Sequence, residues 1–174
     1  NSVSLKVTGT TGDHRITLAV AHDRSSLDMR ARGEYADGSW QGTIAGLSGT
    51  QAPFGRFDLS APVTVIASPE RFFLSSFVLT SSKGERLDAS ADISMEPMKG
   101  AAAVEWRQVD LGRIGALVDP AKIQGVSSGA GRVQWLSQKR LALSGKVTAS
   151  GAFSQGPLKV QADSINGDRK STRL

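Results

Sequence analysis

Apolar and polar residues alternate with a period of two along most of the chain. At its start, Val3, Leu5 and Val7 are separated by single polar residues. Successive side chains of a strand point to opposite faces, so this alternation predicts a strand with one apolar and one polar face. Similar runs begin about every 10–14 residues, which is the spacing of consecutive antiparallel strands.

The alternating runs predict an all-β fold. Turn-type sequences lie between many of them, at 9–13, 37–38, 83–84, 97–100 and 156–157, because Gly, Pro, Asn and Asp favour turn conformations. We therefore expect an antiparallel sheet with one dry face and one wet face. The runs cover residues 3–7, 16–20, 27–31, 40–44, 57–59, 63–65, 73–79, 87–93, 102–106, 133–135, 141–143, 147–149 and 158–162.

One segment has a helical pattern instead. Asp110 is an expected N-cap, because its side chain can accept hydrogen bonds from the first backbone N–H groups of a helix. Pro120 ends the run, since the residue before a proline avoids helical geometry. The pattern predicts a two-turn helix over 110–118, with apolar residues at the spacing i, i+3, i+6 and i+7: Leu111, Ile114, Leu117 and Val118.

The composition indicates one folded domain. The chain has 174 residues, of which 39% are apolar and 21% are charged, too apolar a mixture for a disordered segment. There is no cysteine, which excludes disulfides and thiolate metal sites.

The charge pattern argues against nucleic-acid binding. Residues 168–174 resemble the translation of a sequencing adapter, and they carry three of the 21 basic and one of the 16 acidic residues. Without them the net charge falls from +5 to +3. The other charges alternate in sign and form no basic block, so we expect no nucleic-acid partner.

The two ends predict an internal segment of a longer protein. The chain starts with Asn1, and the first strand pattern is already under way by Val3. We expect residues 1–167 to be an internal β-repeat segment and residues 168–174 to be a non-native read-through tail. A segment trimmed by design is the alternative.

Few residues suggest catalysis, and we expect no catalytic residue, metal or cofactor. His14 and His22 each stand beside an aspartate, but neighbouring strand residues point to opposite faces, and a metal site needs a convergent third ligand. We therefore expect both histidines to be solvated turn residues. Glu105, on a largely apolar strand, is the one candidate acid for carbohydrate chemistry, which would need a second acid facing it. An ordinary outward-facing position fits Glu105 better.

The apolar face has little within the chain to cover it, because one short helix cannot shield about a dozen strands. This face must pack against another sheet, curl onto itself, or hold apolar ligands. The residues expected to line a groove are Ile16, Leu18, Val20, Leu27, Met29, Phe57, Leu59, Val63, Val65, Leu87, Ala89, Ala91, Ile93, Val133, Trp135, Leu141, Leu143, Val147, Leu158 and Val160.

Six stretches, in this order, resemble the periplasmic repeat region of TamB proteins, the inner-membrane component of the translocation and assembly module. AsmA-like and bridge-like lipid-transfer proteins are the wider relatives. The resemblance covers roughly residues 35–165, through loose tryptophan–glycine, Leu-x-x-Pro and paired-glycine motifs. The stretches are Trp40–Leu47, Gly55–Val63, Phe72–Leu79, Arg86–Ala91, Val109–Ile114 and Gln124–Gly129.

The resemblance implies a fold and a function. The fold would be an elongated, curved antiparallel sheet, a β-taco, forming an open trough with an apolar lining. Such a trough would carry phospholipid acyl chains between the inner and outer membranes, in the periplasm, or assist outer-membrane protein assembly. The inner-membrane anchor and the region that engages an outer-membrane barrel partner would lie outside this segment. The alternative is a structural β-solenoid or adhesin-like segment with a closed core.

Overall fold

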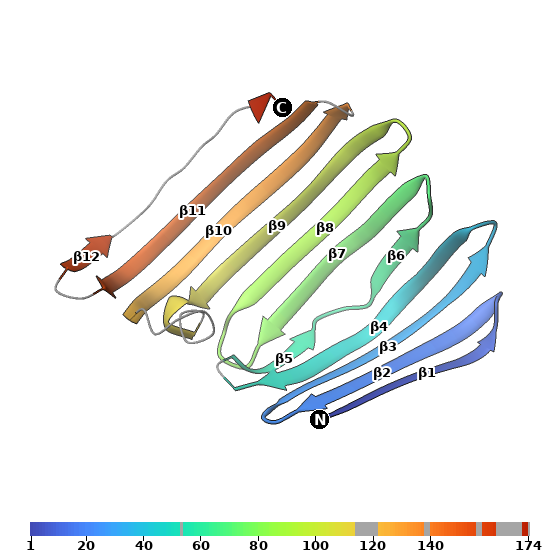
Figure 1. The fold of residues 1–174 in the computed structure, drawn as a ribbon, viewed down its shortest axis with the longest axis horizontal. Coiled ribbons are helices and arrows are strands. Elements are labelled where there is room, and N and C mark those ends of the chain that lie inside the picture. Colours follow the sequence, from blue (N-terminus) through green and yellow to red (C-terminus); the bar gives the residue numbers. More distant parts are fainter. Residues whose placement is uncertain (53, 114–121, 138–139, 156–157, 163–171, 174) are drawn as a thin grey trace.

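The chain folds into one large, curved antiparallel sheet, as expected (Figure 1). The computed structural model describes residues 1–52, 54–113, 122–137, 140–155, 158–162 and 172–173, and the side chains of residues 122, 123 and 152 onward are not described. The strands are β1 (Ser2–Thr10), β2 (Asp13–His22), β3 (Ser25–Ala36), β4 (Ser39–Gln51), β5 (Gly55–Leu59), β6 (Val63–Ala67), β7 (Arg71–Ser81), β8 (Arg86–Met95), β9 (Met98–Asp110), β10 (Lys122–Ser137), β11 (Arg140–Gln155), β12 (Leu158–Ala162) and β13 (Thr172–Arg173).

The strands follow one another across the sheet in nearly the order of the sequence. The path runs β1-β2-β3-β4-β5-β7-β8-β9-β10-β11-β12, and β13 pairs with β11. Short turns join many of the neighbours. At Asp37-Gly38 both residues have positive φ, 51° and 74°, as the tightest hairpin turns require. β1 and β12 lie at opposite ends of the sheet, so the described strands form an open sheet (Figure 1).

One row of the sheet is made of two short strands. β5 pairs with one half of β4 and β6 with the other, and both also pair with β7. Pro62 lies in the break between them. Proline has no backbone N–H to give to a neighbouring strand, so it suits a strand interruption.

The start of the predicted helix is confirmed. Residues 111–113 are helical, and Asp110 Oδ1 accepts hydrogen bonds from the backbone N–H of Gly112 at 2.8 Å and of Arg113 at 3.4 Å. Asp110 is therefore the N-cap. The rest of the predicted helix, 114–118, lies outside the described residues.

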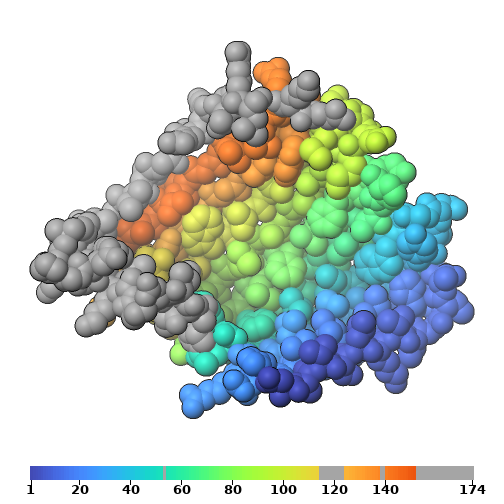
Figure 2. Space-filling view, in the orientation of Figure 1, coloured from blue at the N-terminus to red at the C-terminus, as the bar shows by residue number. Residues whose placement is uncertain are grey.

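The sheet has almost no core. Among the residues with described side chains, only two apolar ones are buried, Val63 at 0% exposed and Ala31 at 6%. Figure 2 shows successive strands as successive bands across one face of the molecule. In the part of the chain that the structure describes, no second sheet lies against this one. No helix in that part is long and apolar enough to cross a membrane.

Candidate functional site

The strand register gathers the apolar residues on one face of the sheet, called here the apolar face. Residues paired across neighbouring antiparallel strands project to the same side. One such row crosses five strands through Val7, Ile16, Ala31, Ile44 and Val63.

A second row shows that the same face continues across the other half of the sheet. It runs through Leu74, Ala91, Ala102, Val133 and Leu143. The apolar face therefore extends without a break from β1 to β11.

The candidate groove residues all belong to this face where their side chains are described. The eighteen are Ile16, Leu18, Val20, Leu27, Met29, Phe57, Leu59, Val63, Val65, Leu87, Ala89, Ala91, Ile93, Val133, Trp135, Leu141, Leu143 and Val147. Leu158 and Val160 belong to β12, whose side chains are not described.

Three bulges keep the apolar residues on one face where the sequence spacing slips. Ile44 and Leu47 are three residues apart, yet both pair with apolar-face residues of β3, because an extra residue bulges between them. Leu74 and Phe77 flank a second bulge, in β7. The third lies in β9, at Arg107 and Gln108.

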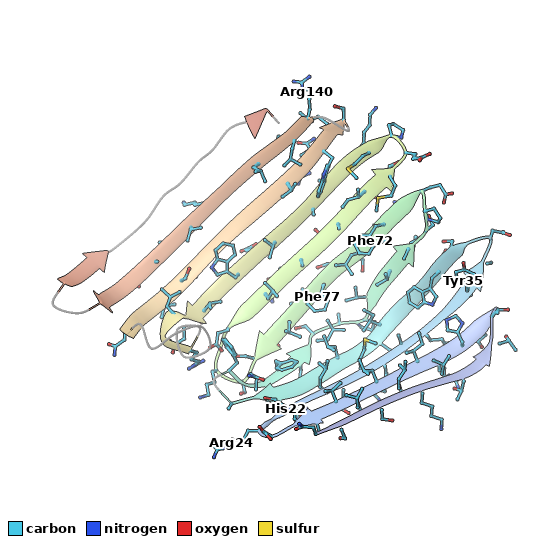
Figure 3. All side chains as sticks on the ribbon, viewed as in Figure 1. His22, Arg24, Tyr35, Phe72, Phe77 and Arg140 are labelled. Carbon is cyan, nitrogen blue, oxygen red and sulfur yellow. The ribbon has the colours of Figure 1, made fainter. Side chains whose placement is uncertain are left out.

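The predicted lining included Phe57 and Trp135 but left out four other large aromatic residues of this face, although their place in the alternation could have identified some of them. Trp40, Trp106, Phe72 and Phe77 lie on the apolar face, and Figure 3 labels Phe72 and Phe77 on β7 in the middle of the sheet. The Trp106 ring lies close over Gly129, so that a Cβ there would come within 2.5 Å of its Cζ2. Because glycine has no side chain, an aromatic ring can lie directly on its backbone.

His14 is not the solvated turn residue that the sequence suggested. It lies in β2 on the apolar face, and the Trp40 indole N–H donates a 2.8 Å hydrogen bond to His14 Nε2. Its neighbour Asp13 points to the opposite face and forms an ion pair with Arg32, so the two residues share no site, as expected. His22 ends β2 and is exposed, with Asp23 3.8 Å away.

The opposite face, called here the polar face, carries ion pairs. Arg71 and Asp92 join β7 to β8 with a nitrogen–oxygen distance of 2.9 Å, and the hydrogen bond from Arg71 lowers the pKa of the Asp92 carboxyl. Arg56 lowers the pKa of Asp58 in the same way, within a single strand. These carboxylates are held in the charged form.

Glu105 lies on the polar face. It pairs with Arg107 at 2.7 Å and sits opposite Asp88 in the register. The hydrogen bond from Arg86 lowers the pKa of Asp88. A glycosidase needs an acid whose pKa is raised so that it keeps its proton, and Asp88 is shifted the other way. No cluster of metal-binding side chains occurs among the residues described.

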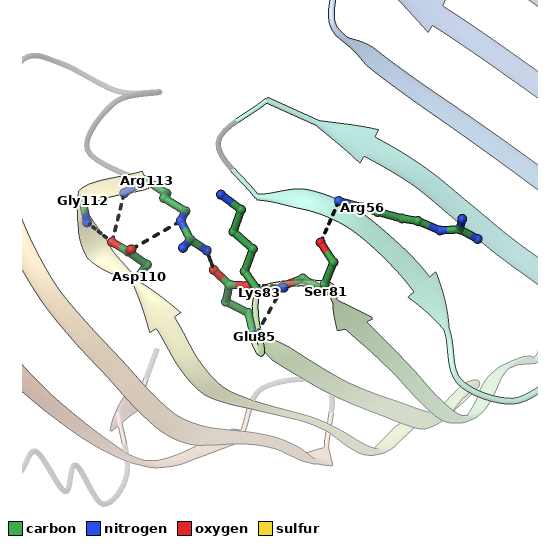
Figure 4. A network of polar contacts seen from close by, with 8 residues as sticks. Arg56, Ser81, Lys83, Glu85, Asp110, Gly112 and Arg113 are labelled. Atoms are coloured by element: carbon green, nitrogen blue, oxygen red, sulfur yellow. Dashed lines mark hydrogen bonds and ion pairs between the residues drawn. The ribbon is translucent and has the colours of Figure 1, made fainter.

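One charged cluster lies at the end of the apolar face (Figure 4). Glu85, only 8% exposed, accepts hydrogen bonds from the Ser81 hydroxyl and from Arg113. Arg113 Nε is also 3.3 Å from Asp110. The helical residues 111–113 therefore bring a cation to a buried carboxylate whose partner from the sheet, the Ser81 hydroxyl, is uncharged. The alternation of apolar and polar residues along the sequence did not predict this cluster.

The described residues form an open sheet whose apolar face is continuous and has no second sheet against it, which limits the proteins this chain can resemble. A family model described as TamB, N-terminal domain, matches residues 1–171. The chain belongs to the TamB family. Among curated proteins and solved structures, none matches it.

TamB membership fits the architecture derived above. The family is linked to assembly of the bacterial envelope, and the expected TamB resemblance is confirmed over nearly the whole chain. The all-β, open, curved sheet expected from that resemblance is the fold observed.

Proposed function

We propose that the apolar face of this TamB segment is a wall of a hydrophobic groove that carries phospholipid acyl chains through the periplasm. The observation that supports this most strongly is the near absence of a core: only Ala31 and Val63 are buried apolar residues among the described side chains. Covering such a face with hydrocarbon is favourable, by about 0.8 kcal/mol for each CH₂ group removed from water.

The face suits movement of lipid better than tight binding of one ligand. Its side chains are mostly aliphatic and half-buried, in rows that repeat from strand to strand. A lining of this kind offers acyl chains similar surroundings along its length, while headgroups stay in water at the open edge. The role is therefore physical, and we propose no catalytic step.

The rest of the proposal concerns regions outside this chain. A membrane anchor would hold the groove to the inner membrane, and another region would engage an outer-membrane barrel assembly partner. This segment would contribute trough wall between them. The closed-core alternative is less suitable, because the described strands leave the apolar face open.

Photo-crosslinking along single strands tests the proposal. A benzoyl-phenylalanine placed in the full-length protein at Leu18 or Val133, on the apolar face, should form adducts with phospholipid. At the adjacent positions Thr17 and Gln134, on the polar face, it should not. Adducts at all four positions, or at none, would contradict the groove.

A further inference from the structure

An apolar pocket opens at one end of the apolar face, near the ends of β5, β7 and β8. Its walls include Phe54, Phe57, Leu79, Leu87 and Val109. Its volume is about 440 Å³, which is within the range of small-ligand sites. The pocket is a hollow in a surface that is otherwise an open sheet face.

The pocket has one polar end. Ser81 and Glu85 line it there, and Glu85 is held by Ser81 and Arg113. Arg113 Nε also lies 3.3 Å from Asp110, so Arg113 has two carboxylate partners. This end is therefore a fixed polar wall at the rim of the sheet, and an amphiphile would enter with its polar head on this side.

Lys83 lies beside the polar end and has no carboxylate partner among the residues that the structure describes. The Lys83 stem lies against Gly55, next to Phe54 of the pocket wall, so that a Cβ at Gly55 would be 3.4 Å from Lys83 Cε. Figure 4 shows Lys83 between Arg113 and Arg56. Among the described residues, Lys83 forms no ion pair, whereas Arg56, Arg86 and Arg113 each have a carboxylate partner.

We propose that this pocket seats one acyl chain of a phospholipid whose phosphate is bound by Lys83. The proposal rests on the groove function above and adds to it one defined lipid-binding position, formed by this pocket and Lys83. An apolar cavity with a lysine beside its polar end, one that forms no ion pair among the described residues, is complementary to a hydrocarbon chain that ends in an anionic phosphate. The pair of buried Glu85 and half-buried Arg113 fixes the polar side of the pocket and so orients the lipid.

The test compares two reporter positions and two charge reversals in the full-length protein. Benzoyl-phenylalanine is placed at Leu87, in the pocket, or at Leu143, on the same face but outside it; the two side chains are 37% and 40% exposed. Each reporter is combined with Lys83→Glu or with the control Lys99→Glu, on the polar face. The probe is vesicles of phosphatidylethanolamine with a minor share of phosphatidylglycerol.

We expect Lys83→Glu to lower the lipid adduct at Leu87 roughly tenfold, the loss of about one charge-assisted hydrogen bond. The adduct at Leu143 should persist, and Lys99→Glu should change neither. Circular dichroism of each variant checks that the fold is intact. If Lys83→Glu leaves the Leu87 adduct unchanged while Leu143 still reacts, the proposed lipid-binding position at the pocket is wrong and the groove function is retained. If neither position reacts in the unaltered protein, both proposals fail.

Discussion

At the scale of single residues, the contact between His14 and Trp40 anchors the apolar face near the first turns. Trp40 lies over the backbone of Gly33 and Gly42, and its indole N–H has His14 Nε2 as acceptor. A partly buried N–H without an acceptor costs about 1–3 kcal/mol. The histidine thus lets a large aromatic ring lie on the sheet without losing a hydrogen bond.

A double-mutant cycle measures this contact. His14→Leu should destabilise the chain by about 1–2 kcal/mol, because it leaves the Trp40 N–H unsatisfied. In a Trp40→Phe background the same change should cost little, since no N–H remains. Urea unfolding followed by circular dichroism gives the four stabilities. Additive losses, within about 0.3 kcal/mol, would show that the hydrogen bond contributes nothing.

The acid sensitivity of the polar face is also set by single pairs. The pKa of Asp92 is lowered by Arg71 on the neighbouring strand, and that of Asp58 by Arg56 two residues away. A carboxyl whose pKa is lower in the folded state stabilises the fold above its unfolded pKa, near 3.8, and this stabilisation is lost as pH falls through the folded value. The melting temperature should therefore fall below about pH 4.

The variants Asp92→Asn and Asp58→Asn distinguish an ion pair between two strands from an ion pair within one strand. The Arg56–Asp58 pair spans only two residues, so it can also form in the unfolded chain, whereas the cross-strand pair with Asp92 needs the folded sheet. Asp92→Asn should lower the melting temperature at pH 7 more and flatten its acid dependence more. Thermal melts from pH 7 to pH 3 make the comparison. Equal effects of the two variants would rule out this distinction.

At the scale of strands, alternation predicted which residues share a face except where a bulge intervenes. The rows through Ile16 and Val133 follow directly from period two. Counting by twos from Phe77, however, puts Phe73 on the apolar face, while the register puts it on the polar face, opposite Asp92. A bulge inserts one residue without a distinctive sequence signal, so its position depends on the neighbouring strands.

The sequence likewise predicted only part of the candidate site, namely which aliphatic residues share the apolar face. A side chain's face follows from its position in a strand, so the aliphatic lining could be named in advance. The Glu85–Arg113 pair could not be predicted, because it joins a residue of the connection before β8 to a helix residue 28 positions later. Contacts of this kind depend on how the connection folds back, which a local period does not encode.

Glycine under aromatic rings is a feature of strand packing that can be tested within one strand. At Gly129 a Cβ would lie 2.5 Å from the Trp106 ring and 2.7 Å from the Lys146 carbonyl oxygen, whereas at Gly131 its nearest neighbour would be Val104 Cγ1 at 3.6 Å. Gly129→Ala should cost about 1–3 kcal/mol through overpacking. Gly131→Ala should be neutral or stabilising by about 0.5 kcal/mol. Chemical unfolding of both variants decides; equal losses would contradict the steric argument.

At the scale of the whole molecule, an apolar face that the described residues leave uncovered should make the chain self-associate in water. Exposed apolar patches larger than a few hundred Å² are uncommon in soluble monomers and mark interaction sites. On β1 alone, Val3, Leu5 and Val7 are 73%, 65% and 59% exposed. Lipid or detergent that covers the face should therefore compete with self-association.

The 174-residue chain should accordingly form oligomers in buffer and become monomeric in a mild detergent, with fluorescent hydrophobic dyes bound only in buffer. Leu5→Lys with Val7→Lys should reduce the oligomers, because it removes apolar surface from β1. The control Lys6→Glu with Thr8→Lys changes the other face of the same strand and should leave them unchanged. Light scattering and dye fluorescence measure both. A chain that is monomeric in buffer and binds no dye would have its apolar surface sealed, and such a surface could not carry lipid.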